Sequence, residues 1–173
     1  MSAPTTHPTL AMTTAPPPRR SAEEQARVHA ELTELFERRI CFNEVLGLQI
    51  DSLDPQAFRM RFAMRPELVG HYLYGRLHGG VISATLDATG GNAVMVALAE
   101  KHAHETPEQV MHRFARIGTI DLRVDYLRPG IGSFFIASAE VTRLGGRVAS
   151  VQMRLVNNAD ELIATGAAAY IVS

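Results

Sequence analysis

Residues 77–100 read LHGGVISATLDATGGNAVMVALAE, and the fold depends on this stretch. The His-Gly-Gly at 78–80 is typical of a point where a loop turns into a helix. From residue 81 to residue 100 most side chains are apolar or small, which predicts one long buried helix. Asp87 is the exception, because it sets a carboxylate in the middle of that helix.

The segments on both sides of this helix have the composition and alternation of β-strands. Residues 46–53 and 58–64 precede it, separated by an Asp54-Pro55 turn. Four more candidate strands follow it, at 119–127, 133–144, 147–157 and 162–172, and Gly145-Gly146 predicts a hairpin between two of them. Runs of strands after a single buried helix favour an antiparallel sheet, so the order of elements predicts an α+β domain.

The beginning of the chain divides into a leader and a helix. Residues 1–20 hold five of the nine prolines, five threonines and no acidic residue, so we expect a disordered Pro/Thr-rich leader. Ser21 and Glu24 have the spacing of a capping box and open a helix that should end before Gly47. Residues 21–173 are then a single domain, in which the polar stretch 101–117 is expected to be a surface insertion.

Charge and cysteine content exclude several classes of protein. Seventeen basic residues stand against eighteen acidic ones, and a net charge of −1 offers no electrostatic footprint for nucleic acid. No uninterrupted apolar run approaches the ~18 residues needed to cross a bilayer, so we expect no membrane association. The single cysteine, Cys41, cannot form an internal disulfide, and we expect a buried, inert thiol in a cytoplasmic protein.

Asp87 is the first candidate for chemistry. A carboxylate in an apolar helix is costly unless it is paired, reached by solvent or functional. Gly80 lies seven residues earlier, so it shares a helix face with Asp87, and Ala84 and Gly91 lie nearby, leaving room for a ligand. Two interpretations are equally open: a catalytic carboxylate, or a core aspartate bonded to backbone or to an arginine.

The segment His78-Gly79-Gly80 is the second candidate. The first N–H groups of a helix have no acceptor within it, and glycines let a carbonyl oxygen approach them closely. Such a helix start is able to act as an oxyanion hole for acyl transfer. The commoner interpretation is an ordinary glycine-rich helix start, but an Asp nine residues after the His makes the combination more specific.

Two stretches resemble a known family. LHGGVISATLD at 77–87 and IGTIDLRVDYLRP at 117–129 are similar to hotdog-fold acyl-CoA thioesterases of the PaaI-like type, close to the YigI medium/long-chain group. The resemblance covers about residues 30–172 and implies a hotdog fold, with the sheet wrapped around one central helix. It also implies hydrolysis of an acyl-CoA thioester to free acid and CoA, with no cofactor and no metal.

The resemblance assigns roles to individual residues. Asp87 corresponds to the catalytic carboxylate, acting either as general base on water or as nucleophile. In the motif His78-Gly79-Gly80, the N–H of Gly79 corresponds to the group that polarises the thioester carbonyl. Thr119 corresponds to a hydroxyl that helps hold the water in some members. His71 stands where related enzymes have an Asn that contacts the carbonyl, a departure that puts this contact in doubt.

The spacing of Gly79 and Asp87 bears on assembly. Eight residues of helix separate them by ~12 Å, too far for both to reach one carbonyl. A symmetric dimer with antiparallel central helices would bring Gly79 of one subunit towards Asp87 of the other. We therefore expect a homodimer, or the dimer of dimers that hotdog thioesterases often form, with shared active sites.

Surface side chains supply the remaining candidates. The phosphates of CoA could meet arginines at strand ends or at a hairpin, namely Arg128, Arg143 and Arg147. His102, His104 and His112 lie near one another in sequence, but a polar insertion lacks the fixed frame that a metal site needs, so a solvated loop is the better interpretation.

Three rival functions remain for the same fold. A non-catalytic acyl-CoA-binding sensor or regulator would keep the cleft without needing Asp87. A hotdog hydratase needs a His a few residues after the Asp, and the sequence after Asp87 is ATGGNAV. A structural or interaction module leaves Asp87 unexplained.

Overall fold

The structure is a computed structural model that describes residues 17–173, so the disorder expected for most of the leader lies outside the described residues. The elements are α1 (Ala22–Glu34), the π-helical turn η1 (Leu35–Arg39), α2 (Cys41–Leu46), β1 (Gln49–Ser52), β2 (Phe58–Ala63), the 3-10 turn η2 (Pro66–Leu68), β3 (Val69–His71), β4 (Arg76–Leu77), α3 (Gly79–Lys101), α4 (Pro107–Phe114), β5 (Gly118–Tyr126), β6 (Phe134–Leu144), β7 (Val148–Asn157) and β8 (Leu162–Ile171).

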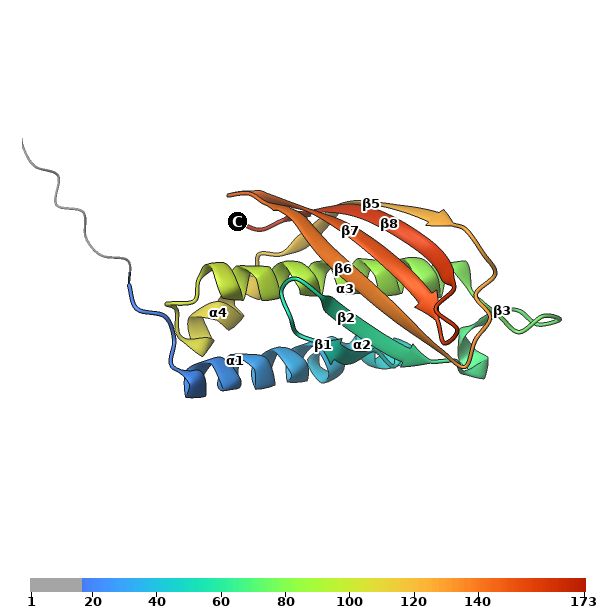
Figure 1. Cartoon of the computed structure of the whole chain (residues 1–173), viewed down its shortest axis with the longest axis horizontal. Helices are drawn as coiled ribbons and strands as arrows, with labels where there is room; N and C mark the ends of the chain where they lie inside the picture. The colour runs from blue at the N-terminus through green and yellow to red at the C-terminus, as the bar shows by residue number, and fades with distance from the viewer. Residues whose placement is uncertain (1–16) are drawn as a thin grey trace, which may run out of the picture.

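Six strands form one antiparallel sheet in the order β1-β2-β6-β7-β8-β5. The sheet lies over the long helix α3, and α1 runs beside that helix (Figure 1). The predicted α+β arrangement, with an antiparallel sheet around one long helix, is therefore confirmed. The β6–β7 hairpin also forms where Gly145-Gly146 predicted it.

The helix α3 is the centre of the core. Leu86, Val94 and Met95 are fully buried, as the apolar sequence predicts. By length and hydropathy alone this helix could cross a membrane, which the sequence analysis did not foresee. However, 61% of its most apolar 18-residue window is buried inside the fold, as is typical of the core helix of a globular domain.

The predicted first helix is broken into two. Ser21 caps α1 with Glu24 in the expected capping box, and Gly47 ends α2 in the left-handed conformation (φ 72°). Between them, a π-helical turn ends at Ile40, whose extended backbone redirects the chain. The Asn43 side-chain amide donates to the Phe36 carbonyl (2.9 Å) and stabilises the break. Sequence periodicity did not signal this kink.

Two expectations for single segments were wrong. Cys41 is exposed at the start of α2, because the break turns this part of the helix outwards. The stretch 101–117 is more than a polar insertion: Thr106 opens α4 with a capping box, and Val110 is fully buried. The helix α4 packs on α1, so it is part of the core.

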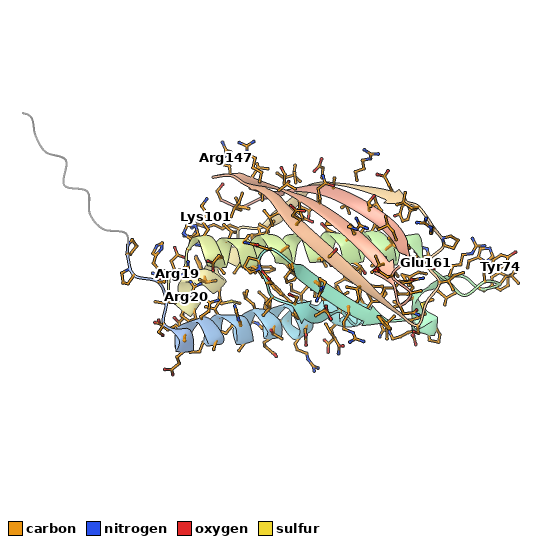
Figure 2. The ribbon with its side chains drawn as sticks, in the orientation of Figure 1. Arg19, Arg20, Tyr74, Lys101, Arg147 and Glu161 are labelled. Carbon is orange, nitrogen blue, oxygen red and sulfur yellow. The ribbon has the colours of Figure 1, made fainter. Side chains whose placement is uncertain are left out.

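Arg19 and Arg20, the last two residues of the expected leader, contact the C-terminal end of α3. The guanidinium of Arg20 donates to the carbonyls of Ala99 (2.7 Å), His102 (2.8 Å) and Glu105 (3.1 Å), where α3 ends. Its backbone N–H donates to the Ala103 carbonyl, while Arg19 forms an ion pair with Glu100. Both arginines lie at the Lys101 end of α3 (Figure 2). They were assigned to the leader because composition carries no information about such a contact.

We therefore expect Arg20→Ala to destabilise the domain by about 1–3 kcal/mol, because a cation donating to several helix-terminal carbonyls is lost. Thermal unfolding of the variant, of a chain lacking residues 1–18 and of a chain lacking residues 1–20 checks this. The shorter deletion should behave like the full chain, and the longer one like Arg20→Ala. Arg19→Ala is the matched control. The ion pair of Arg19 with Glu100 lies on the surface, so its loss should lower the free energy of unfolding little. Equal melting temperatures for Arg20→Ala and the full chain would show that the Arg20 contacts do not stabilise the domain.

Candidate functional site

A pocket of about 270 Å³ opens beside Asp87. Its floor is the face of α3 that carries Ala84, Ala88 and Gly91, and these small side chains leave the room that the sequence predicted. Its apolar wall comes from the kink before α2 and from the end of α4, through Ile40, Phe42, Phe114 and Ile117. The kink before α2 and the end of α4 thus shape this pocket.

Two hydroxyl groups hold the Asp87 side chain. Thr119 Oγ1 donates to Asp87 Oδ1 at 2.9 Å, and the Tyr170 hydroxyl lies 3.3 Å from the same oxygen and 2.9 Å from the Asp87 backbone carbonyl. Within residues 17–173, no arginine pairs with this carboxylate and no hydrogen bond reaches Oδ2. An aspartate with a free oxygen at a pocket wall fits the catalytic interpretation better than the structural one.

Tyr170 was missed in the sequence. It is 1% exposed on β8 and lies directly across from Thr119 of β5 in the sheet register. Burial, together with the nearby Asp87 carboxylate, raises the pKa of the Tyr170 hydroxyl far above its ordinary value. The signal for it was Gly90, because a Cβ there would collide with the Tyr170 hydroxyl.

The start of α3 distinguishes between the two glycines of the motif. His78 is the N-cap residue, and its Nδ1 accepts the Gly80 N–H at 2.8 Å, so that N–H is already used. The Gly79 N–H is the first of the helix. Among the described residues it has no hydrogen-bond acceptor. The Tyr126 hydroxyl donates to the Gly79 carbonyl (3.2 Å). Gly79 is thus the candidate donor to a substrate carbonyl, and His78 shapes the turn.

Thr119 is the predicted site residue that reaches Asp87. Gly79 and His71 of the same chain do not reach it. One continuous helix separates Gly79 from Asp87, so the ~12 Å spacing stands. His71 lies on the exposed β3–β4 hairpin, where its ring contacts Tyr72 and Tyr74 (centroid distances 6.1 and 4.8 Å). It does not line the pocket beside Asp87.

The three candidate arginines lie at two ends of the sheet. Arg143 and Arg147 flank the β6–β7 hairpin, at the end where Val148, Ile171 and Gly118 lie in register. Arg128 follows β5 at the opposite end and donates to the Leu162 carbonyl (2.9 Å). Arg147 and Glu161 are labelled at these two ends in Figure 2. Within one chain they cannot form a single phosphate site.

Among the histidines of the insertion, His102 lies in an ion-pair network with Glu105 and Arg113. Potential ligand atoms of His102, His104 and Glu105 lie within 4.8 Å of one another. However, Arg113 donates to both oxygens of Glu105 and lies 3.3 Å from His102 Nδ1, so a metal cation would meet a fixed positive charge. Burial and Arg113 also lower the pKa of His102. This cluster fits a metal ion poorly, while His112 lies apart from it on α4.

Residues 74–164 match the family model of the thioesterase superfamily. The chain belongs to this family. It is 35% identical over 139 residues to the medium/long-chain acyl-CoA thioesterase YigI of Escherichia coli K12, covering 80% of this chain and 90% of the relative. The YigI protein of Salmonella typhimurium LT2 is 36% identical over the same length, with the same coverage.

A crystal structure from Shewanella oneidensis, described as related to the thioesterase superfamily, superposes with a TM-score of 0.81. Its sequence is 38% identical, and the match covers 86% of this chain and 97% of that one. The predicted resemblance and the hotdog fold are thereby confirmed. In this chain, the segment that matches the family model includes Gly79, Asp87 and Thr119. Phe42 and Tyr170 lie outside that segment.

Proposed function

We propose that the chain is an acyl-CoA thioesterase that hydrolyses a medium- or long-chain acyl-CoA to free acid and CoA. The observation that carries the proposal is the Asp87 carboxylate, held through one oxygen by hydroxyl groups, with its other oxygen free beside an apolar pocket. Membership of the thioesterase superfamily and the YigI relatives support the same reaction.

In the proposed reaction Asp87 acts as general base. Its Oδ2 takes a proton from water, and the water oxygen attacks the thioester carbonyl carbon. The negative charge that develops on the carbonyl oxygen is stabilised by the Gly79 N–H at the positive end of α3. The C–S bond then breaks, and the leaving CoA thiolate takes the proton from Asp87. Thr119 donates to Asp87, so its oxygen is left to accept a hydrogen bond from the water.

The proposal requires two subunits, and the free edge of the sheet supports this. The strand β5 is the edge of the sheet and exposes Ile120 and Tyr126, followed by Leu127. An unpaired edge with apolar side chains is a surface on which another strand pairs readily. We propose that two copies join through β5 to give a homodimer, which is able to assemble further into a dimer of dimers.

Antiparallel pairing of β5 with its copy would complete the site. Thr119, bonded to Asp87, lies at one end of this nine-residue strand, and Tyr126, bonded to Gly79, lies at the other. A twofold axis near Leu122 therefore places Gly79 of the partner subunit beside Asp87. The same operation carries Arg128 of the partner subunit towards the end where Arg143 and Arg147 lie. These three arginines are proposed to bind the phosphates of CoA.

The apolar wall is proposed to take the acyl chain. Phe42 and Phe114, from segments far apart in the chain, both line the pocket. The polar CoA portion would remain outside, which agrees with a cytoplasmic enzyme acting on a dissolved substrate. The β3–β4 hairpin carries His71 at the Gly79 end of α3, so in the dimer it would approach the site of the other subunit.

A panel of acyl-CoA substrates tests the function. We expect release of free CoA from octanoyl-, decanoyl- and palmitoyl-CoA, with kcat/KM at least tenfold above that for acetyl-CoA or phenylacetyl-CoA. Every additional methylene beyond acetyl buries apolar surface in the pocket, and at ~0.8 kcal/mol per buried CH2 a few of them are enough for this selectivity. Binding of decanoyl-CoA without any CoA release would reject the enzyme and favour the acyl-CoA-binding regulator.

A further inference from the structure

We propose that Tyr170 is a positioning residue of this site, which together with Thr119 holds Oδ1 of Asp87 and leaves Oδ2 as the reactive oxygen. The inference rests on the proposed function, because it assigns a role in that same reaction. It concerns a residue outside the segment that matches the family model, on the last strand of the chain.

The arrangement depends on two neighbouring strands. Thr119 of β5 and Tyr170 of β8 are a directly opposed pair in the sheet, and both hydroxyls point at the same oxygen of Asp87 on α3. The single hydroxyl proton of Tyr170 is shared between Oδ1 at 3.3 Å and the Asp87 backbone carbonyl at 2.9 Å, which ties the side chain to the helix turn that carries it. A carboxylate that accepts hydrogen bonds at one oxygen from two directions has little freedom to rotate.

Tyr170 acts as a donor and not as a base. Its pKa is raised by burial and by the Asp87 carboxylate, so the hydroxyl stays protonated at any pH at which the enzyme works. A protonated phenol next to a carboxylate donates its hydrogen bond to the charged form and favours it.

Gly90 is the residue of α3 that lies against the Tyr170 hydroxyl. Glycine inside a helix costs stability, so its presence calls for a reason. A Cβ at Gly90 would collide with the Tyr170 hydroxyl and lie 2.7 Å from the Met153 sulfur. At the neighbouring Gly91 a Cβ would meet only the Tyr170 ring at an ordinary 3.5 Å. The helix therefore lacks a side chain at the one position where the tyrosine hydroxyl must approach Asp87.

The decisive variant is Tyr170→Phe, which removes the hydroxyl and keeps the ring. We expect kcat for decanoyl-CoA to fall about tenfold, with KM changed less than twofold, because the loss of one hydrogen bond misaligns the carboxylate without removing the pocket wall. Thr33→Val, which removes a hydroxyl that donates to the His29 carbonyl within α1 and lies outside the pocket, is the matched control and should match the wild type.

Gly90→Ala provides a second route to the same change. Its methyl group should displace the hydroxyl and lower kcat by a similar factor in the folded enzyme. Combined with Tyr170→Phe it should add less than twofold, because both variants remove one contact.

The possible failures are separable. If Tyr170→Phe lowers only the melting temperature, with kcat and KM unchanged, the tyrosine is structural and the inference fails while the proposed function stands. Fully independent effects of Gly90→Ala and Tyr170→Phe would also overturn the pairing. If Asp87→Asn retains full activity, the inference and the role of Asp87 as base both fail, while hydrolysis of acyl-CoA stands. The proposed function itself fails only if the wild-type protein releases no CoA.

Discussion

Asp87→Asn is expected to lower kcat for decanoyl-CoA by ~10²–10⁴-fold, the usual contribution of a positioned base. The amide keeps the size of the side chain, and its oxygen can still accept the hydrogen bonds that Thr119 and Tyr170 donate to Oδ1. The other oxygen becomes an NH2 group, which cannot take a proton from water. The fold should therefore survive, and the melting temperature and the native mass should be unchanged.

The structural interpretation of Asp87 predicts the opposite pattern. If the carboxylate only stabilised the core, the variant would unfold at a lower temperature, and its folded fraction would hydrolyse the substrate at the normal rate. Active-site titration of the folded fraction, measured with kcat on the same sample, separates the two interpretations. A variant that is stable and fully active would remove Asp87 from the mechanism altogether.

Local patterns were enough to predict most of the fold. The capping box of Ser21 and Glu24, the left-handed Gly47 and the alternation within the β6–β7 hairpin each depend on neighbours only a few residues away. Strand limits therefore agreed within a residue or two for the four C-terminal strands. The pocket face of α3 followed from helical periodicity in the same way.

Contacts between residues far apart in the sequence could not be predicted from local patterns. Tyr170 is 83 residues from Asp87 in sequence, and Arg20 is 79 residues from Ala99. The break at Ile40 comes before the part of α2 that lines the pocket, and no glycine or proline marks it in the sequence. Gly90 was the one local trace of such a contact, since a glycine in a buried helix indicates close approach.

The central claim is that each active site is built from two chains, and it is open to a subunit-mixing experiment. Gly79→Pro removes the N–H proposed to polarise the carbonyl. Proline is favoured at the first position of a helix, which Gly79 occupies after an extended His78 (ψ 138°). A Cβ at this position meets Tyr126 at an ordinary 3.6 Å, so the fold should tolerate the ring. Gly79→Ala keeps the N–H and is the matched control.

Gly79→Pro and Asp87→Asn should each be inactive as homodimers. After subunit exchange in an equimolar mixture, a heterodimer carries one site with both groups intact and one with neither. Half of the dimers are mixed in random exchange, so about one quarter of the wild-type activity should return. Mixing Asp87→Asn with the double variant Gly79→Pro/Asp87→Asn should restore none. If heterodimers are demonstrated by native mass spectrometry and the first mixture stays inactive, Gly79 and Asp87 do not act across an interface, and the shared site is contradicted.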